Sequence, residues 1–156
     1  MSKREEASGR KIIATNRKAR FEYHILERFE AGLVLQGTEV KSLRQGRASI
    51  GEGYASVEDG QLWLFDINIP HYEMGNRANH EPKRPRKLLL HKAEIRRLMG
   101  KTTEKGLTLI PLALYFTRGR AKIELGLCRG KKAYDKRESI KRRDQDRDLQ
   151  QQMKER

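Results

Sequence analysis

The stretch YASVEDGQLWLF, residues 54–65, carries the clearest fold signal in the sequence. Polar and apolar side chains alternate up to the pair Asp59-Gly60, after which an apolar run begins at Leu62. An Asp-Gly pair between two such segments favours a two-residue β-turn, because both residues tolerate the positive φ angles that this turn requires. The sequence therefore predicts a β-hairpin with its turn at residues 59–60.

Upstream of this hairpin we expect one long strand and one short helix. Alternation begins at Phe21, and small residues near Gly32 interrupt it, which predicts a strand over residues 21–35 that bends at that glycine. Threonine is a common helix N-cap and glycine commonly ends a helix, so a helix of about two turns is expected between Thr38 and Gly46.

Downstream, residues 70–87 predict an exposed loop, because they contain three prolines and five Lys or Arg side chains. The charge of this loop indicates a surface that faces an anion. A helix is expected over residues 93–99, ending at Gly100. Two alternating strands are then expected within residues 107–127, joined by a tight turn at residues 118–120.

Hairpin-linked strands without a repeated strand-helix-strand order predict a mainly β fold. We expect an OB-like antiparallel barrel of about six strands, with two or three short helices and a basic C-terminal tail. The expected segments are a flexible basic N-terminus at residues 1–15, the barrel at 16–130 and the tail at 131–156. Both ends contain little apolar surface to offset the entropy of ordering them, so both are expected to order only on binding.

The distribution of charge favours a polyanionic partner. The chain has 156 residues, with 35 Lys and Arg against 21 Asp and Glu, and a formal net charge of +14. Residues 1–20 and residues 129–156 contribute +5 each, so the two ends hold most of the excess. Binding to RNA also uses flat side chains that stack on unpaired bases, although most aromatics on alternating strands belong to the core. The aromatic candidates are Phe21, Tyr23, Tyr54, Trp63 and Tyr72.

The sequence contains no recognisable pattern for catalysis, metal binding or cofactor binding. Its four histidines are widely spaced, and its glycines lack the spacing of a phosphate-binding loop, so no metal and no cofactor are expected. The single Cys128 follows an alternating strand and is expected to be a buried core residue. Because no catalytic constellation is found, the protein is expected not to be an enzyme. The lone cysteine predicts the cytoplasm, and the lack of a long apolar run predicts no membrane partner.

Residues 35–50, LQGTEVKSLRQGRASI, closely resemble the SmpB family, the SsrA-binding proteins that partner transfer-messenger RNA (tmRNA). The resemblance spans nearly the whole chain. Further matching segments follow in the family's order, namely NRKARFEYHI (16–25), FEAGLVLQG (29–37), RKLLLHKAEI (86–95), GLTLIPLALYF (106–116) and GKKAYDKRESIK (130–141).

The resemblance implies a function and two partners. It implies a monomer whose OB-type barrel binds the transfer-RNA-like domain of tmRNA and delivers it to stalled ribosomes. The tail is expected to be disordered when free and helical on the ribosome, where it enters the vacant messenger channel and contacts ribosomal RNA of the decoding region. This process is trans-translation, which rescues ribosomes and tags incomplete peptides.

The resemblance and the charge together name the residues expected to bind. The RNA-binding candidates are Asn16, Arg17, Lys18, Arg20, Glu30, Glu39, Lys41, Ser42, Arg44 and Lys87. The candidates for ribosome binding by the tail are Gly130, Lys131, Lys132, Tyr134, Asp135, Lys136, Arg137, Ile140 and Lys141. Among these, Glu30 is a carboxylate facing RNA, so it must accept hydrogen bonds from base edges or orient a basic neighbour.

Two other functions remain open at the level of sequence. A general RNA-binding OB module would share the charge and the fold, but its RNA binding and its ribosome function would not separate. An RNA-processing enzyme would release a cleaved or modified product from RNA. Truncation of the tail tests the first alternative, and product formation on tmRNA tests the second.

Overall fold

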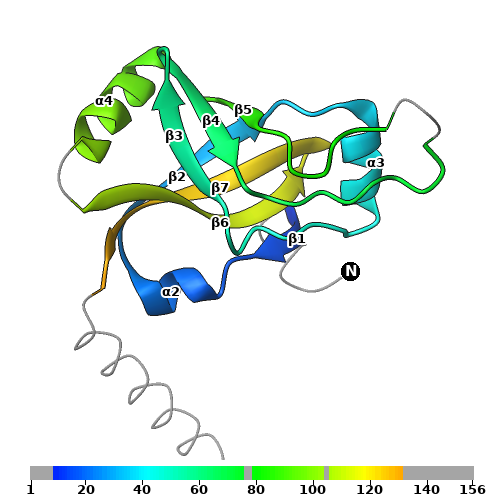
Figure 1. Cartoon of the computed structure of the whole chain (residues 1–156), viewed down its shortest axis with the longest axis horizontal. Coiled ribbons are helices and arrows are strands. Elements are labelled where there is room, and N and C mark those ends of the chain that lie inside the picture. The colour runs from blue at the N-terminus through cyan, green and yellow to red at the C-terminus, as the bar shows by residue number, and fades with distance from the viewer. Residues whose placement is uncertain (1–8, 76–78, 104–105, 132–156) are drawn as a thin grey trace, which may run out of the picture.

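The computed structural model describes residues 9–75, 79–103 and 106–131 (Figure 1). Within these residues, seven strands form one antiparallel sheet in the order β1-β6-β3-β4-β5-β2-β7, and a further pairing between β6 and β7 closes it. The mainly β, OB-like barrel expected from the sequence is confirmed. Its strands are β1 (Arg10–Thr15), β2 (Tyr23–Leu33), β3 (Tyr54–Glu58), β4 (Gln61–Phe65), β5 (Arg86–Leu89), β6 (Leu107–Thr117) and β7 (Arg120–Gly130). Its helices are α2 (Lys18–Glu22), α3 (Gly37–Arg44) and α4 (Lys92–Thr102).

Strand β6 is central to the closure of the barrel. One edge of β6 pairs with β7 along its whole length. On the other edge, Leu109 pairs with Ala55 of β3, and residues 113–117 pair with β1. Pro111 has no N–H to donate to a ladder, and the register with β7 shifts between Pro111 and Ala113. Strands β3 and β1 therefore follow one another along a single edge of β6.

Both tight turns expected from the sequence are confirmed. The hairpin β3–β4 turns at Asp59 and Gly60, whose φ angles are 51° and 74°. The hairpin β6–β7 turns at Arg118 and Gly119, with φ angles of 51° and 76°. Two consecutive positive φ angles match the right-handed twist of the flanking strands, which explains the glycine at the second position of both turns and the short polar Asp59 at the first position of one. Arg118 adopts the same left-handed conformation with a long side chain.

The N-terminal half departs from the prediction at two points. Residues 10–15 form β1, so the expectation of a segment without structure over residues 1–15 is wrong for this part; residues 1–8 lie outside the described residues. Ile13 and Ala14 pack on the core, which gives β1 the apolar contact that charge counting overlooks. The strand expected from Phe21 begins only at Tyr23, because α2 includes Phe21.

The details of bends and helix ends also differ from the sequence prediction. The register of β2 shifts between Ile25 and Glu27 and not at Gly32, where a side chain would crowd the neighbouring strand β5. Helix α3 has Gln36 as its N-cap, two residues earlier than Thr38. Helix α4 continues past the exposed Gly100 to Thr102, so this glycine does not end the helix.

The segment from residue 66 to β5 packs against α3 and is not a free loop. His80 and Arg86 from this segment are buried, with 3% and 0% of their surface exposed. Prolines and positive charge favour an exposed loop in the sequence, but two of the polar residues instead bond to the interior. Residues 76–78, in the middle of the segment, lie outside the described residues.

Leucine and isoleucine side chains fill the barrel. The core includes Leu62, Leu64, Leu109, Leu125 and Leu127, all nearly without exposed surface. No helix among the described residues is long and apolar enough to cross a membrane.

Candidate nucleic-acid interface

Helix α2 presents three cations at one end of the barrel. Arg17, which precedes the helix, and Lys18 and Arg20 within it are exposed. Asn16 is buried; its Nδ2 donates to the Pro111 carbonyl at 2.9 Å, and its Oδ1 accepts from the Ala19 N–H at 3.3 Å. The Asn16 amide therefore fixes α2 on β6, and a contact of Asn16 itself with RNA stays a prediction. Its neighbours on α2 are placed for contact with an anion.

A groove runs beside α2 on the outer face of the sheet. It has a volume of about 390 Å³, and its lining includes Arg17, Arg20 and Arg28, the apolar residues Ile25 and Leu112, and the carboxylate of Glu124. Arginines beside apolar side chains suit a phosphate backbone and its sugars, and Glu124 is already paired with Arg28. This arrangement brings the N-terminal cations next to β2, which the sequence order does not reveal.

Glu30 lies in a network of charges on this outer face. It sits directly opposite Glu124 of β7, and two like charges in that position repel each other. Arg10 bridges the two carboxylates, at 3.4 Å from Glu30 and 3.3 Å from Glu124, and Arg28 binds Glu124 at 3.0 Å. These contacts fit the second of the two roles considered for Glu30, the orientation of a basic neighbour, and contact with base edges stays a prediction.

Tyr115 supports the same network from beneath. Its hydroxyl donates a hydrogen bond to Glu30, and the Arg10 guanidinium lies 4.4 Å from the centre of its ring. Burial and this hydrogen bond raise the pKa of Tyr115 well above its ordinary value. The phenol therefore remains a hydrogen-bond donor at neutral pH.

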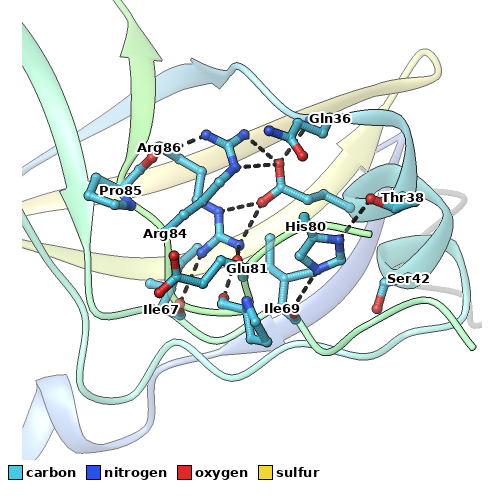
Figure 2. A network of polar contacts seen from close by, with 12 residues as sticks. Gln36, Thr38, Ser42, Ile67, Ile69, His80, Glu81, Arg84, Pro85 and Arg86 are labelled. Atoms are coloured by element: carbon cyan, nitrogen blue, oxygen red, sulfur yellow. Dashed lines mark hydrogen bonds and ion pairs between the residues drawn. The ribbon is translucent and has the colours of Figure 1, made fainter. Parts of the chain in front are cut away.

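Glu39 is buried in α3, beneath the surface that was expected to face RNA. Figure 2 shows the guanidinium groups of Arg84 and Arg86 converging on a carboxylate of this helix. Glu39 Oε1 accepts from Arg84 Nε at 3.1 Å and from the Gln36 N–H at 2.8 Å, and its Oε2 accepts from Arg86 Nε at 2.6 Å. Burial acts to raise the pKa of Glu39, but the hydrogen bonds from Arg84 and Gln36 and the charge of Arg86 outweigh it and lower the pKa.

Two further contacts attach α3 to the segment before β5. Ser42 Oγ donates to the Pro70 carbonyl at 2.8 Å. His80 lies between Thr38 Oγ1 at 2.9 Å and the Ile69 carbonyl at 2.8 Å (Figure 2). Ser42 is fully buried, as Glu39 is, and the polar groups of both side chains bind protein atoms. A contact of either residue with RNA stays a prediction.

The other α3 candidates and Lys87 remain accessible. Lys41 and Arg44 are exposed, with Lys41 Nζ 5.6 Å from the centre of the Tyr72 ring and Arg44 Cζ 5.9 Å from that of Phe116. Lys87 is half-buried on β5. These cations stay candidates for RNA binding.

The start of the predicted tail is fixed against α2. The Lys131 N–H donates to the Glu22 carbonyl, and Lys131 Nζ donates to the Arg20 carbonyl, both at 2.8 Å. Gly130 is exposed at the end of β7. The other tail candidates lie outside the described residues, namely Lys132, Tyr134, Asp135, Lys136, Arg137, Ile140 and Lys141.

Arg10, Arg28 and Glu124 belong to the site but were not identified from the sequence. Only one local signal was available: Arg28 and Glu30 are two residues apart on one strand and therefore share a face. Arg10 lies 20 positions from Glu30 and 114 positions from Glu124 in the sequence, so no local pattern predicts either contact. In the part of the chain that the structure describes, no group of three or more His, Cys, Asp or Glu side chains could hold a metal ion.

Comparison with known proteins identifies a family for this architecture. The family model described as SmpB protein matches residues 13–155. The chain is 61% identical over 142 residues to an SsrA-binding protein of Acidothermus cellulolyticus, covering 91% of this chain and 89% of the relative. It is 63% identical over 139 residues to an SsrA-binding protein of Carboxydothermus hydrogenoformans, covering 89% and 93%. A chain of the solved structure called "tmRNA-SmpB: a journey to the center of the bacterial ribosome" is 54% identical and matches with a TM-score of 0.67, covering 81% of this chain and 93% of that one.

Proposed function

The chain belongs to the SmpB family, and from this membership we propose that it is an RNA-binding adaptor of trans-translation. The barrel binds the transfer-RNA-like domain of tmRNA and delivers it to stalled ribosomes in the cytoplasm. The adaptor acts by positioning its partners and not by catalysis. The relatives named for binding SsrA and the match to a tmRNA-SmpB chain support this proposal.

The observation that carries the proposal is the row of exposed cations on a rigid support. The buried Asn16 amide fixes the orientation of α2. This helix carries the exposed Lys18 and Arg20, and the exposed Arg17 directly precedes it. A cationic surface held in one geometry recognises the shape of a folded RNA through its phosphates. The groove with Arg28 extends this surface along the barrel.

The tail supplies the second function in this proposal. Residues 131–156 carry ten Lys or Arg side chains, which suits them for contact with ribosomal RNA. We assign to the tail the entry into the vacant messenger channel and the contact with the decoding region. Lys131 sets the point where the tail leaves the barrel, because both its backbone and its side chain are bonded to α2.

A pair of variants tests whether the two functions separate. A chain truncated after Lys131 keeps the two bonds to α2, whereas truncation after Gly130 removes them. We expect the chain ending at Lys131 to bind tmRNA with wild-type affinity and to fail in tagging of peptides on stalled ribosomes. The combined change Arg17→Gln and Arg20→Gln is expected to weaken tmRNA binding itself.

Two results would contradict the proposal. If the chain ending at Lys131 loses tmRNA binding, the division between barrel and tail is wrong and a general RNA-binding module becomes the better description. If purified wild-type protein converts tmRNA into a cleaved or modified product, the adaptor is an enzyme. Gel mobility of the RNA and mass spectrometry of its fragments measure the second outcome.

A further inference from the structure

A second cleft also borders α2, and Asn16 lines both this cleft and the arginine groove. It opens between α2 and the turn formed by residues 51–53, and it has a volume of about 290 Å³. The exposed side chains of Lys18 and Glu52 line its rim. Its other lining residues include Glu22, Tyr23, Tyr54 and Thr108 of β6. This volume is at the small end of the range of ligand sites, roughly 300–1,000 Å³, and suits a single flat group.

Tyr54 provides a supported aromatic surface in this cleft. Its side chain is 41% exposed, although the residue begins a strand whose next residue is in the core. Phe65 stacks on the Tyr54 ring with a centroid distance of 5.2 Å and an interplanar angle of 25°. One face of the ring is thus covered and held, while the ring still lines the cleft. A base that stacks on such a ring loses little side-chain entropy, because the ring is already fixed.

The rim of the cleft combines a cation with a carboxylate that a phosphate can replace. Lys18 Nζ lies 2.8 Å from Glu52 Oε1, and the two side chains are 62% and 80% exposed. An exposed ion pair of this kind contributes little to stability. Lys18 therefore loses little free energy when it leaves Glu52 and binds an RNA phosphate. The hydroxyl of Thr108, another lining residue, makes no hydrogen bond among the described residues, which leaves it available to a base edge.

We propose that this cleft takes one unpaired nucleotide of an RNA partner, with its base stacked on Tyr54 and its phosphate on Lys18. The inference rests on the proposed function, since it assumes that RNA is the partner. An unpaired nucleotide can come from tmRNA or from ribosomal RNA, and the same chemistry recognises both. The stacked ring, the exchangeable cation and the small volume together favour a nucleotide over a paired stem, whose bases are not accessible to stacking.

Binding measurements on a pair of Tyr54 variants test the stacking. Tyr54→Ala removes the ring, and Tyr54→Phe keeps it as the matched control. Affinity is measured in two arms, one with full-length tmRNA and one with stalled ribosomes. We expect Tyr54→Ala to weaken binding by about 5- to 150-fold in the arm that supplies the nucleotide, the range of one stacked base, and Tyr54→Phe to stay near wild type.

A fluorescence reporter makes the test independent of any loss of stability in Tyr54→Ala. Trp63 is the only tryptophan of the chain. Tyr54→Trp in a Trp63→Phe background therefore places the single indole in the cleft, where stacking of a base quenches its emission. We expect quenching that saturates with the same RNA whose affinity falls in the Tyr54→Ala variant.

The inference is overturned if Tyr54→Ala binds both RNAs within twofold of wild type, if Tyr54→Phe loses as much affinity as Tyr54→Ala, or if the indole emission does not change on binding. Failure of the proposed function looks different, because wild-type protein would then bind neither tmRNA nor ribosomes. A variant defect confined to one arm supports the cleft and names the source of the nucleotide.

Discussion

Replacement of the buried Glu39 by alanine tests whether this residue serves the fold or the RNA. The change leaves Arg86, whose side chain is fully buried, without its carboxylate partner. Arg86 keeps hydrogen bonds to the carbonyls of Ile67 at 3.0 Å and Pro82 at 2.9 Å, so part of its charge stays compensated. Arg84 is 24% exposed and can turn toward solvent.

These contacts set the size of the expected effect. Removal of one partner of a buried pair costs about 3–5 kcal/mol, and the remaining carbonyl contacts favour the lower end, about 3 kcal/mol. Domains are commonly stable by only about 5–15 kcal/mol, so Glu39→Ala should remain folded at low temperature but lose much of its margin. The expected fall in Tm is about 10 °C.

The free energy of unfolding can be measured with urea, using the fluorescence of Trp63 in β4. Glu52→Ala is the matched control, because that carboxylate is exposed, and we expect its midpoint to stay at the wild-type value. A fall of less than about 1 kcal/mol for Glu39→Ala would refute the structural role derived from a buried pair. Loss of tmRNA affinity in a fully stable Glu39→Ala protein would show instead that Glu39 contacts the RNA.

The same pair predicts a dependence on pH. Since the pKa of Glu39 in the folded protein is lowered from 4.5, its contribution to stability is fully present above the pKa of the unfolded chain. The contribution falls as pH drops below 4.5 and through the lower folded pKa, where the carboxylate gains a proton. The stability difference between wild type and Glu39→Gln should therefore be largest near neutral pH and shrink in acid. A difference that grows in acid would contradict this assignment.

Three further predictions concern the barrel and its RNA surface. Tyr115→Phe removes the hydroxyl that bonds to Glu30 and should lower the free energy of unfolding by about 1 kcal/mol, measured in urea, unless the carboxylate finds another donor. Gly126→Ala would put a Cβ 2.9 Å from a methyl group of Leu112 and should cost about 1–3 kcal/mol; a neutral result would mean that Leu112 shifts freely. Arg17→Gln combined with Arg20→Gln should make tmRNA binding less sensitive to salt. The slope of log affinity against log salt concentration should become shallower by about 1 for each RNA phosphate that these arginines neutralise in the wild type. An unchanged slope would exclude both arginines from the interface.

Local patterns predicted those parts of the fold that local chemistry determines. The turns at Asp59-Gly60 and Arg118-Gly119 need positive φ angles, and few residues accept them, so both hairpins could be predicted from the sequence. Strand β1 could not, because its partner β6 lies far along the chain and the core on which Ile13 and Ala14 pack is formed by distant strands. The short helix α2 depends in the same way on the bond of the buried Asn16 amide to the distant Pro111 carbonyl.

The candidate site divides along the same line. The exposed cations Arg17, Lys18 and Arg20 were predicted from the family resemblance together with charge, and neither needs knowledge of tertiary contacts. The burial of Glu39 could not be predicted, because a charged residue is rarely buried unless it is paired. Its arginine partners, which look like part of a basic loop in the sequence, are 45 and 47 residues away.

The pairing of β1 with β6 also has a consequence for the synthesis of this protein. Gly9 and Thr117, which are hydrogen-bonded at one end of this pairing, are 108 residues apart. Strand β1 therefore leaves the ribosome long before its partner β6 has been synthesised. Strand β7, which follows, pairs with both β2 and β6. A nascent chain that stops before Arg120 therefore lacks the strand that closes the barrel, and contacts so distant in sequence form late and slowly. An interrupted copy of this protein would emerge without the surface that α2 and the closed sheet create together, so unfinished copies would not compete with complete ones for RNA.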